Sequence, residues 1–392
     1  MRPAPTTVPT RFVHVPEATA RFGDQVKRLG PLFLRGDDLA DEAARVLAEL
    51  GAAEREPLLA RALKSEEGAA RAPLEVRRFA ESLHHVPFWV SSERTDRGGR
   101  AMLRTGVFGV FALAFRSLIV AYCSPAGNKP LAFSGRLTQN APRRLSETGR
   151  FIQAVCQPGG LRPGEGGFVA AARVRLMHAQ VRRLLAVSPK WNAGAWGVPI
   201  NQVDMAGTTL LFSLQVCDAV RALGAPFNDQ DAEDLQHLWR YVGYLMGVEE
   251  ELLATSVYEA RALWGMILAT QGPPDADSAA LAKALIESQS TQALTPQERE
   301  RARRFTPIAY GLARYLAGDE FADGLGFPKS MWRFAGPALA TLMSRAGRLA
   351  RKLPGAEQLM VEAGVGYWRR TVDLGLGSED ARFDMPDGVQ HA

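Results

Sequence analysis

His178 is the residue whose position in this chain best suits metal chemistry. It lies in residues 173–185 (RVRLMHAQVRRLL), where apolar residues recur with the period of an α-helix. Val174, Val181 and Leu185 lie four, three and seven residues away, so they share its helical face. The imidazole is therefore expected to point toward a core, where it could bind a buried metal ion or a haem iron.

Two arginines stand beside this histidine. Arg175 and Arg182 lie three and four residues from His178. An imidazole on an apolar face, with guanidinium groups at its edge, suits an iron porphyrin, which has a flat apolar body, a metal centre and two carboxylates. The competing interpretation is a hydrogen-bonded core histidine, which is the commoner role of a single histidine on an apolar face. The spacing alone leaves both interpretations open.

A second pair of residues could complete such a site. Arg144 and Thr148 are four residues apart and so share one face of the helix expected there. A guanidinium and a hydroxyl on one face could hold dioxygen or a carboxylate. The alternative is a surface arginine and a threonine that bonds to its own helix backbone. Asn201 and Asp204 are similarly ambiguous, and capping of the next helix explains them most economically.

The elements that would position these residues are all helical. Sustained alternation of apolar and polar residues, which is typical of β-strands, is nearly absent. Apolar residues instead recur with the period of an α-helix along the chain. Asp37 or Asp38, Asn228 or Asp229, and the capping box at 295–298 are the clearest expected helix starts. The expected helical segments include 36–64, 74–94, 101–123, 134–156, 202–223, 231–254, 331–352 and 357–370. We therefore predict an all-α protein.

The same periodicity indicates the domain organisation. Residues 1–30 are proline-rich and weakly periodic, so we expect an irregular N-terminal arm. Residues 31–375 are expected to form a single helical domain, and 376–392 a loose polar tail. The glycine-rich loop at 159–167 is expected to be a connector, because it lacks the Lys-Ser/Thr of a phosphate-binding loop and follows no strand.

Bulk composition excludes several functional classes. The 392 residues include 47 Lys and Arg and 42 Asp and Glu, scattered among one another, so no nucleic-acid-binding stripe is expected. The three cysteines form no zinc spacing and are expected to be buried thiols. The first ten residues lack the apolar core of a signal peptide, so we expect a cytoplasmic protein, with peripheral membrane association left open.

One apolar stretch needs a separate explanation. Residues 107–123 (VFGVFALAFRSLIVAYC) are marginally short for a bilayer, and Arg116 interrupts them near the middle. We expect a buried core helix whose arginine is paired inside the protein, and no transmembrane segment.

Six segments, in unbroken order, resemble one family. They are SPAGNKPLAFSGRL, APRRLSETGRF, GGLRPG, VRLMHAQVRR, WGVPINQVDMAGTTLLFS and LWRYVGYLMGVEEEL. The chain resembles the oxygenases that join latex-clearing proteins (rubber oxygenases) with the fungal MpaB enzyme, most strongly over residues 120–265. The resemblance implies a globin-like helical core that holds haem b. It also implies dioxygen chemistry on an apolar, isoprenoid-like small molecule or polymer, including oxidative C=C cleavage.

The resemblance also assigns roles to residues. It implies that His178 is the proximal iron ligand, that Arg144 and Thr148 belong to the haem pocket, and that Arg175, three residues before the ligand, also binds the cofactor. Rubber-cleaving members carry a lysine immediately before the pocket threonine, and here that position is Glu147. Glu147 could act as a distal acid or base. The departure keeps a second interpretation open, a haem- or lipid-binding protein without turnover, and a third is a purely structural helical bundle. Oligomeric state is not readable from the sequence.

Overall fold

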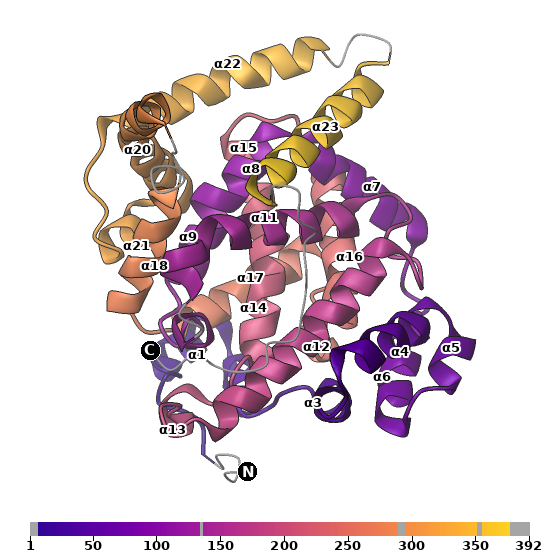
Figure 1. The fold of residues 1–392 in the computed structure, drawn as a ribbon. Helices are drawn as coiled ribbons and strands as arrows, with labels where there is room; N and C mark the ends of the chain where they lie inside the picture. Colours follow the sequence, from indigo (N-terminus) through magenta and orange to yellow (C-terminus); the bar gives the residue numbers. More distant parts are fainter. Residues whose placement is uncertain (1–6, 134–135, 289–294, 351–354, 377–392) are drawn as a thin grey trace.

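Helices account for all of the regular secondary structure in the part of the chain that is described (Figure 1). The computed structural model describes residues 7–133, 136–288, 295–350 and 355–376, and these ranges contain no β-strand. The predicted all-α class is therefore confirmed. The loose tail expected at 376–392 lies outside the described residues apart from Leu376, which ends the last helix.

The α-helices and the shorter 3-10 and π segments follow the chain in this order. They are α1 Val15–Phe22, η1 Asp24–Arg28, α2 Leu29–Leu32, α3 Asp38–Ala48, α4 Ala52–Lys64, α5 Glu66–Ala70, α6 Leu74–His84, α7 Ser92–Arg104, α8 Val107–Ala112, η2 Leu113–Ser117, α9 Leu118–Tyr122, α10 Lys129–Phe133, α11 Arg136–Cys156, α12 Gly166–Val187, α13 Ala193–Trp196, α14 Gln202–Phe212, α15 Leu214–Ala222, α16 Asp229–Leu245, η3 Glu250–Leu252, α17 Val257–Ala269, α18 Ala276–Ile286, α20 Pro296–Ala317, α21 Asp319–Gly324, η4 Met331–Phe334, α22 Ala335–Ala350 and α23 Ala356–Leu376.

Side-chain caps start several of these helices where the sequence predicts them. Asp37 accepts a hydrogen bond from the backbone N–H of Ala40 and so begins α3. Asn228 begins α16, and Thr295 begins α20, each with a reciprocal capping box. These caps satisfy backbone N–H groups that the first turn of a helix leaves unpaired.

The N-terminal arm is not irregular as predicted. It contains α1, η1 and α2, because Pro16 lies in the first turn of α1 and Pro31 lies early in α2, where a missing N–H costs no helical hydrogen bond. The apolar side chains of these short helices form a second core with α14 and α17. The sequence pattern missed this because each helix is too short to show a sustained period.

α7 occupies a crowded central position, and two adjacent glycines make this possible. A Cβ atom added at Gly98 would lie 2.3 Å from the carbonyl oxygen of Asp234 in α16. One added at Gly99 would lie 2.1 Å from the carbonyl oxygen of Cys156 at the end of α11. Both distances are far below van der Waals contact. The Gly98–Gly99 pair therefore lets α16 and α11 approach the backbone of α7 from different sides.

The apolar stretch 107–123 is folded into the protein as α8, η2 and α9. The π segment η2 carries Arg116, whose Nε donates to Oε1 of Gln215 at 2.9 Å and whose Nη2 lies 3.5 Å from Asp218. Its Nη1 donates to the backbone carbonyl of Leu316. The prediction of an arginine paired inside the protein is confirmed.

One helical segment has the length and hydropathy of a membrane span. It is 202–222, comprising α14 and α15, and 72% of its most apolar window is buried in the protein. Ser213 interrupts it with non-helical backbone angles. The bent pair of 92–104 and 107–122 passes the same test only if the two parts, which meet at 89°, are counted together.

Candidate functional site between α11 and α12

The helices that carry the predicted site residues form a hairpin around the glycine-rich loop. A Cβ atom added at Gly167, at the start of α12, would lie 2.6 Å from the carbonyl oxygen of Ala154 and 2.9 Å from Cα of Val155, both near the end of α11. The two helices therefore touch at the loop. Away from it they separate, α11 running across the upper half of Figure 1 and α12 descending below it.

His178 lies on the side of α12 that faces α11 at the loop. It follows Gly167 by eleven residues, a distance of about 16 Å along the helix axis. Eleven residues make three full turns plus about 20°, so His178 and Gly167 lie on nearly the same side of α12. The imidazole is partly buried, and its Nδ1 atom has almost no contact with solvent. The sequence prediction that His178 is directed inward is thus supported by the register of the hairpin.

Thr148 and Arg144 occupy the matching side of α11. Thr148 precedes Val155 by seven residues and Arg144 precedes it by eleven, so both positions return to the face that meets α12. The side chain of Thr148 is partly buried, whereas that of Arg144 lies outside the described residues. Glu147 is partly buried and sits about 100° around the helix from Thr148. The fold therefore sets Thr148 and His178 on the facing sides of two diverging helices.

Arg175 is held by a buried acidic partner. Its Nε and Nη2 donate to the two carboxylate oxygens of Asp37 at 2.6 and 2.9 Å, and both side chains are buried. Its guanidinium also lies 5.3 Å from the ring of Phe79. In this arrangement Arg175 fastens α12 to the start of α3, a contact between residues 138 positions apart that the sequence did not reveal.

Arg182 makes a second contact of the same kind. Its Nε donates to both oxygens of Asp41 at 2.8 and 2.9 Å, and its Nη1 donates to the carbonyl of Ile200 at 2.8 Å. Burial raises the pKa of Asp41 to about 6, and the neighbouring guanidinium only partly opposes that shift. The pairs Arg175–Asp37 and Arg182–Asp41, which we call the α3 clamp, bracket His178 along α12.

There is open space beside α14. Gly207 is buried, yet a Cβ atom added to it would meet no atom of the described residues within 4 Å. Interiors are close-packed, so a buried backbone position next to empty space is unusual.

An aromatic cluster joins α11, α14 and α16. The rings of Phe212 and Trp239 stack at 4.9 Å, and Phe151 lies 6.3 Å from Trp239. Phe151 is one turn from Thr148 along α11. Trp239 lies in the segment LWRYVGYLMGVEEEL that carries the family resemblance, and its stacking partners come from distant helices that the sequence pattern could not identify.

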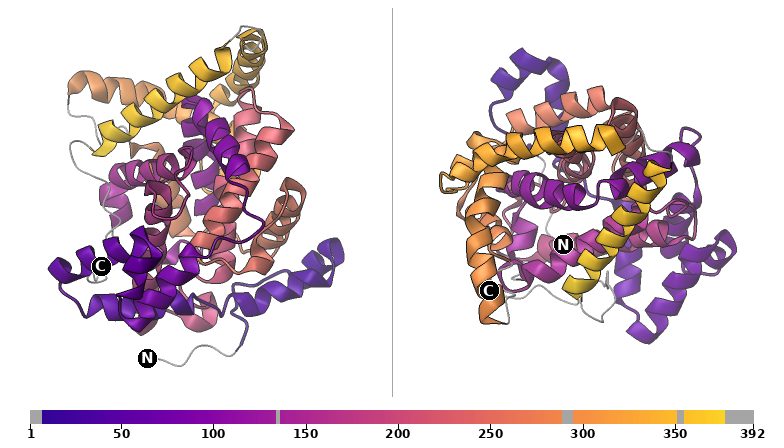
Figure 2. Two further views of the ribbon diagram at one scale, coloured as in Figure 1. Left: turned by 90° about the vertical axis from the view of Figure 1, so that its right-hand side faces the viewer. Right: turned by 90° about the horizontal axis from the view of Figure 1, so that it is seen from above.

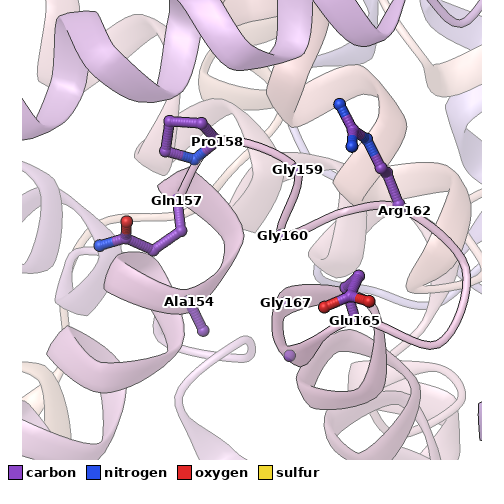
Figure 3. Close-up of a pocket in the computed structure, with 9 residues that line it drawn as sticks. Ala154, Gln157, Pro158, Gly159, Gly160, Arg162, Glu165 and Gly167 are labelled. Carbon is purple, nitrogen blue, oxygen red and sulfur yellow. The ribbon is translucent and has the colours of Figure 1, made fainter.

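The cavity at the glycine-rich loop is a separate feature. It has a volume of about 410 Å³ and lies at the end of α12 remote from His178 (Figure 3). Its lining residues are Ala154, Gln157, Pro158, Gly159, Gly160, Arg162, Glu165, Gly166 and Gly167. Small residues and backbone dominate this lining, which agrees with the prediction that the loop is a connector.

The remaining candidate groups show no metal cluster. Within the ranges that the structure describes, no group of three or more His, Cys, Asp or Glu side chains could hold a metal ion. Cys123, Cys156 and Cys217 are buried, as predicted, and burial raises their thiol pKa values well above the ordinary range. Asn201 caps α14, and Asp204 is bound by Arg11 at 2.7 and 2.9 Å.

A known protein family matches the region of the chain that contains the α11–α12 hairpin. A family model described as "ER-bound oxygenase mpaB/B'/Rubber oxygenase, catalytic domain" matches residues 100–352, which is more than half of the chain. The chain belongs to this family. The matched region includes both α11 and α12, so the helices that carry Thr148 and His178 lie inside the family's catalytic domain.

Individual relatives are distant. The rubber oxygenase of Streptomyces sp. (strain K30) is 24% identical over 278 residues, which make up 70% of this chain and 64% of that protein. The chain thus aligns with less than two thirds of that relative's length. A solved structure of latex clearing protein LCP in the closed state is similar with a TM-score of 0.66 and 22% identity, covering 86% of this chain and 91% of that one. This likeness establishes a shared helical fold.

Proposed function

We propose that this protein is a haem b-dependent oxygenase that acts on an apolar, unsaturated, isoprenoid-like substrate. Membership of the oxygenase family supports the reaction class. The observation that carries the proposal is the placement of His178 on the side of α12 that faces α11, with its Nδ1 atom enclosed by protein.

The described residues fit a haem group. His178 offers one imidazole, whose Nδ1 atom is buried, from the side of α12 that meets α11 at the loop. One histidine is enough for this cofactor, because the porphyrin supplies the other four nitrogens of the iron. Haem, when bound, would supply the redox chemistry that activates dioxygen.

Each protein residue then has a defined task. His178 would hold the iron through Nε2, with its buried Nδ1 on the side away from the metal. The α3 clamp would fix α12, and with it the imidazole, against sliding or rotation. Arg175 and Arg182 act in this proposal as positioning residues, because their guanidinium groups are engaged by Asp37 and Asp41.

The opposite helix would shape the reaction side. Thr148 offers a hydroxyl that can donate or accept a hydrogen bond, and we assign Arg144 to the same face. Glu147, about 100° away around α11, would hold or move a proton at its carboxylate at the edge of the site. Apolar residues of α8, α9 and α14 would line the substrate path and exclude water.

The reaction we propose is balanced with dioxygen alone. One C=C bond and one O₂ molecule give two carbonyl groups, which are a ketone and an aldehyde for an isoprenoid unit. Dioxygen is the oxidant, and the reaction needs no added reductant. The apolar lining would bind the carbon chain, and the hydroxyl of Thr148 would face the reacting end.

An absorption spectrum tests the cofactor assignment. Protein expressed with haem supply should show a Soret band, with bands that shift on dithionite reduction. His178→Ala should lose most of the bound haem while keeping its helical circular dichroism. His85→Ala, which removes an exposed histidine, is the matched control and should keep the haem. Full haem content in His178→Ala would refute the assignment.

Glu147 favours a second candidate function, a haem- or lipid-binding protein without turnover. A glutamate there replaces the lysine of rubber-cleaving members. Haem-loaded protein should be incubated under oxygen with polyisoprene, farnesyl compounds and unsaturated fatty acids. Carbonyl products that appear with wild type and not with His178→Ala support the oxygenase. Stable binding of these compounds without products supports the second candidate.

A further inference from the structure

The segment that leads into α14 contains a strained residue. Ile200 has a φ angle of +51°, in the left-handed region that β-branched residues rarely adopt. On one side of it the N–H of Val198 donates to the carbonyl of Phe33 at 2.9 Å, and on the other the N–H of Gln202 donates to the carbonyl of Arg35 at 3.1 Å. A strained backbone conformation persists only where its surroundings hold it in place. Ile200 would therefore relax if one of its restraints were lost.

The guanidinium of Arg182 supplies a further restraint on this residue. Its Nη1 donates to the carbonyl oxygen of Ile200 at 2.8 Å, and its side chain is 4% exposed. Its Nε donates to both carboxylate oxygens of Asp41 at 2.8 and 2.9 Å. Its Nη2 is buried and has no hydrogen-bond partner among the residues that the structure describes. Arg182 thus links the carboxylate of Asp41 to the strained backbone at Ile200.

Asp41 lies where it can exchange a proton with water. Its side chain is 33% exposed, and the helices from α3 to α6 lie at the edge of the molecule in every view (Figures 1 and 2). Burial, together with Asp37 and Asp38 on the same helix, raises the pKa of this carboxyl to about 6 against the opposing effect of Arg182. Asp41 therefore changes its charge between neutral and mildly acidic pH.

Charged side chains on the elements around Asp41 pair with one another. These pairs are Arg175 of α12 with Asp37 of α3, Arg45 of α3 with Glu75 of α6, Arg77 with Glu81 within α6, and Arg35 with Glu249. Protonation of Asp41 would therefore remove the counter-charge that Arg182 contacts. A buried guanidinium without a counter-charge is strongly unfavourable, so Arg182 would have to move toward water.

We propose that Asp41, Arg182 and Ile200 form an acid-released latch on the segment that leads into α14. When Asp41 takes up a proton, Arg182 loses its counter-charge and turns toward water. The carbonyl of Ile200 then loses its hydrogen bond to Arg182, and the backbone relaxes to a negative φ angle. Residues 197–201 are freed, while the other pair of the α3 clamp still holds α12 against α3.

The change is expected to stay local. In an unfolded chain an aspartate has a pKa of about 3.9, so the folded protein holds the proton on Asp41 more tightly. Through this group, stability therefore rises as the pH falls from about 6 to about 4. Protonation of Asp41 releases the latch without unfolding the protein.

The latch follows from protein contacts and needs no haem. In the proposed function α14 lines the substrate path, so release of the segment before it would alter that path at acid pH. This consequence rests on the proposed function. The exchange experiment that tests the latch measures no turnover, so its failure and a failure of the proposed function are distinguishable.

Hydrogen–deuterium exchange of the full-length protein tests the latch. It is measured at pH 7.5 and pH 5, on either side of the pKa of Asp41, and corrected for the intrinsic effect of pH on exchange. In wild type the peptide that spans 197–203 should exchange at least about fivefold faster at pH 5, whereas α18 should stay unchanged. Asp41→Asn mimics the protonated carboxyl and should exchange fast at both pH values. Glu42→Gln neutralises an exposed carboxylate one residue away, and this matched control should respond like wild type.

Ile200→Gly distinguishes a strained latch from a simple ion pair that weakens in acid. Glycine adopts a positive φ angle without strain, so the segment would have no tendency to relax when Arg182 leaves. In this variant the exchange of the 197–203 peptide should differ by less than about twofold between the two pH values.

Each outcome decides the proposal. Equal exchange of the 197–203 peptide at both pH values in wild type overturns it, and so does wild-type protection in Asp41→Asn at pH 7.5. A full pH response in Ile200→Gly also overturns it, because strain would then not drive the release. Circular dichroism verifies that the variants fold, and wild type with Ile200→Gly decides the question if Asp41→Asn is unfolded.

Discussion

At the scale of single residues, burial rather than residue type sets the chemistry of the histidines. His237 lies on α16, 3% exposed, and its Nε2 accepts a hydrogen bond from the N–H of Ser91 at 3.1 Å. Burial, with help from Arg94 and Arg240, lowers its pKa from 6.5 to about 4. His237 therefore serves the fold as a neutral acceptor, whereas His178 lies on a face that is turned toward another helix.

A pH dependence of stability follows for His237. Because its pKa is lowered in the folded protein, the unfolded chain binds more protons between pH 4 and 6.5, so stability falls as the pH drops through that window. We expect the loss to reach up to about 3 kcal/mol. In His237→Gln, whose amide oxygen can also accept from Ser91, this part of the pH dependence should disappear. Urea denaturation at several pH values measures the difference, and equal slopes for both proteins would contradict the prediction.

At the scale of elements, the α3 clamp couples two helices that are far apart in sequence. Asp37 both caps α3 and pairs with Arg175 of α12, so one side chain fixes the start of one helix and the position of another. The residues of this pair are less than 10% exposed. Removal of one partner from a buried ion pair leaves a buried charge uncompensated, which costs far more than loss of a surface pair.

Asp37→Asn should therefore destabilise the protein by about 3–5 kcal/mol. Glu67→Gln, which breaks the exposed pair with Arg71, is the matched control and should cost less than about 1 kcal/mol. Denaturant unfolding gives both values. If haem binding depends on the position of α12, Asp37→Asn should also lose haem faster to an apo-globin acceptor than Glu67→Gln does. Equal costs for the two substitutions would show that the clamp contributes little.

The helix α14 provides a test of the open space. Gly207→Ala adds a methyl group that meets no atom within 4 Å among the residues that the structure describes, and alanine favours a helix over glycine by about 1 kcal/mol. We expect the haem-free protein to gain up to about that amount in free energy of unfolding. Gly98→Ala is the contrasting substitution, because its methyl group would collide with the backbone of Asp234, and it should destabilise by about 1–3 kcal/mol. A loss of stability in Gly207→Ala would mean that the space is filled.

At the scale of the whole molecule, the late helix α23 closes the main core. Gly364 lets it approach α7, since an added Cβ atom there would lie 2.1 Å from the carbonyl of Leu103. Trp368, 2% exposed, reaches into the same core and lies against Gly109 of α8. The main core therefore includes residues outside the matched family region, which ends at residue 352.

Trp368→Ala should destabilise the protein by about 3–5 kcal/mol, because it would leave a large cavity that the surrounding helices cannot fill. Trp332→Ala is the control, since about half of that side chain is in solvent, and it should cost less than half as much. Thermal unfolding followed by circular dichroism compares the two. A small effect of Trp368→Ala would mean that α23 is dispensable for the core.

The sequence alone was enough to predict the helical class and the capped starts of α3, α16 and α20. These depend on local information, because caps act within one turn and helical periodicity repeats over a few residues. The pairing of Arg116 inside the protein was also predictable, since an arginine in an apolar stretch must be paired when it is buried. The motifs around His178 pointed to the family before any contact was known.

Only the tertiary structure decided which groups meet. Arg175 and Arg182 were expected at the edge of the haem because they flank His178, but the fold brings Asp37 and Asp41 to them from about 140 residues away. The short N-terminal helices, the stacking of Trp239 on Phe212 and the room beside Gly207 are likewise outcomes of packing. Spacing along one helix fixes the direction of a side chain, and long-range packing decides what that side chain meets.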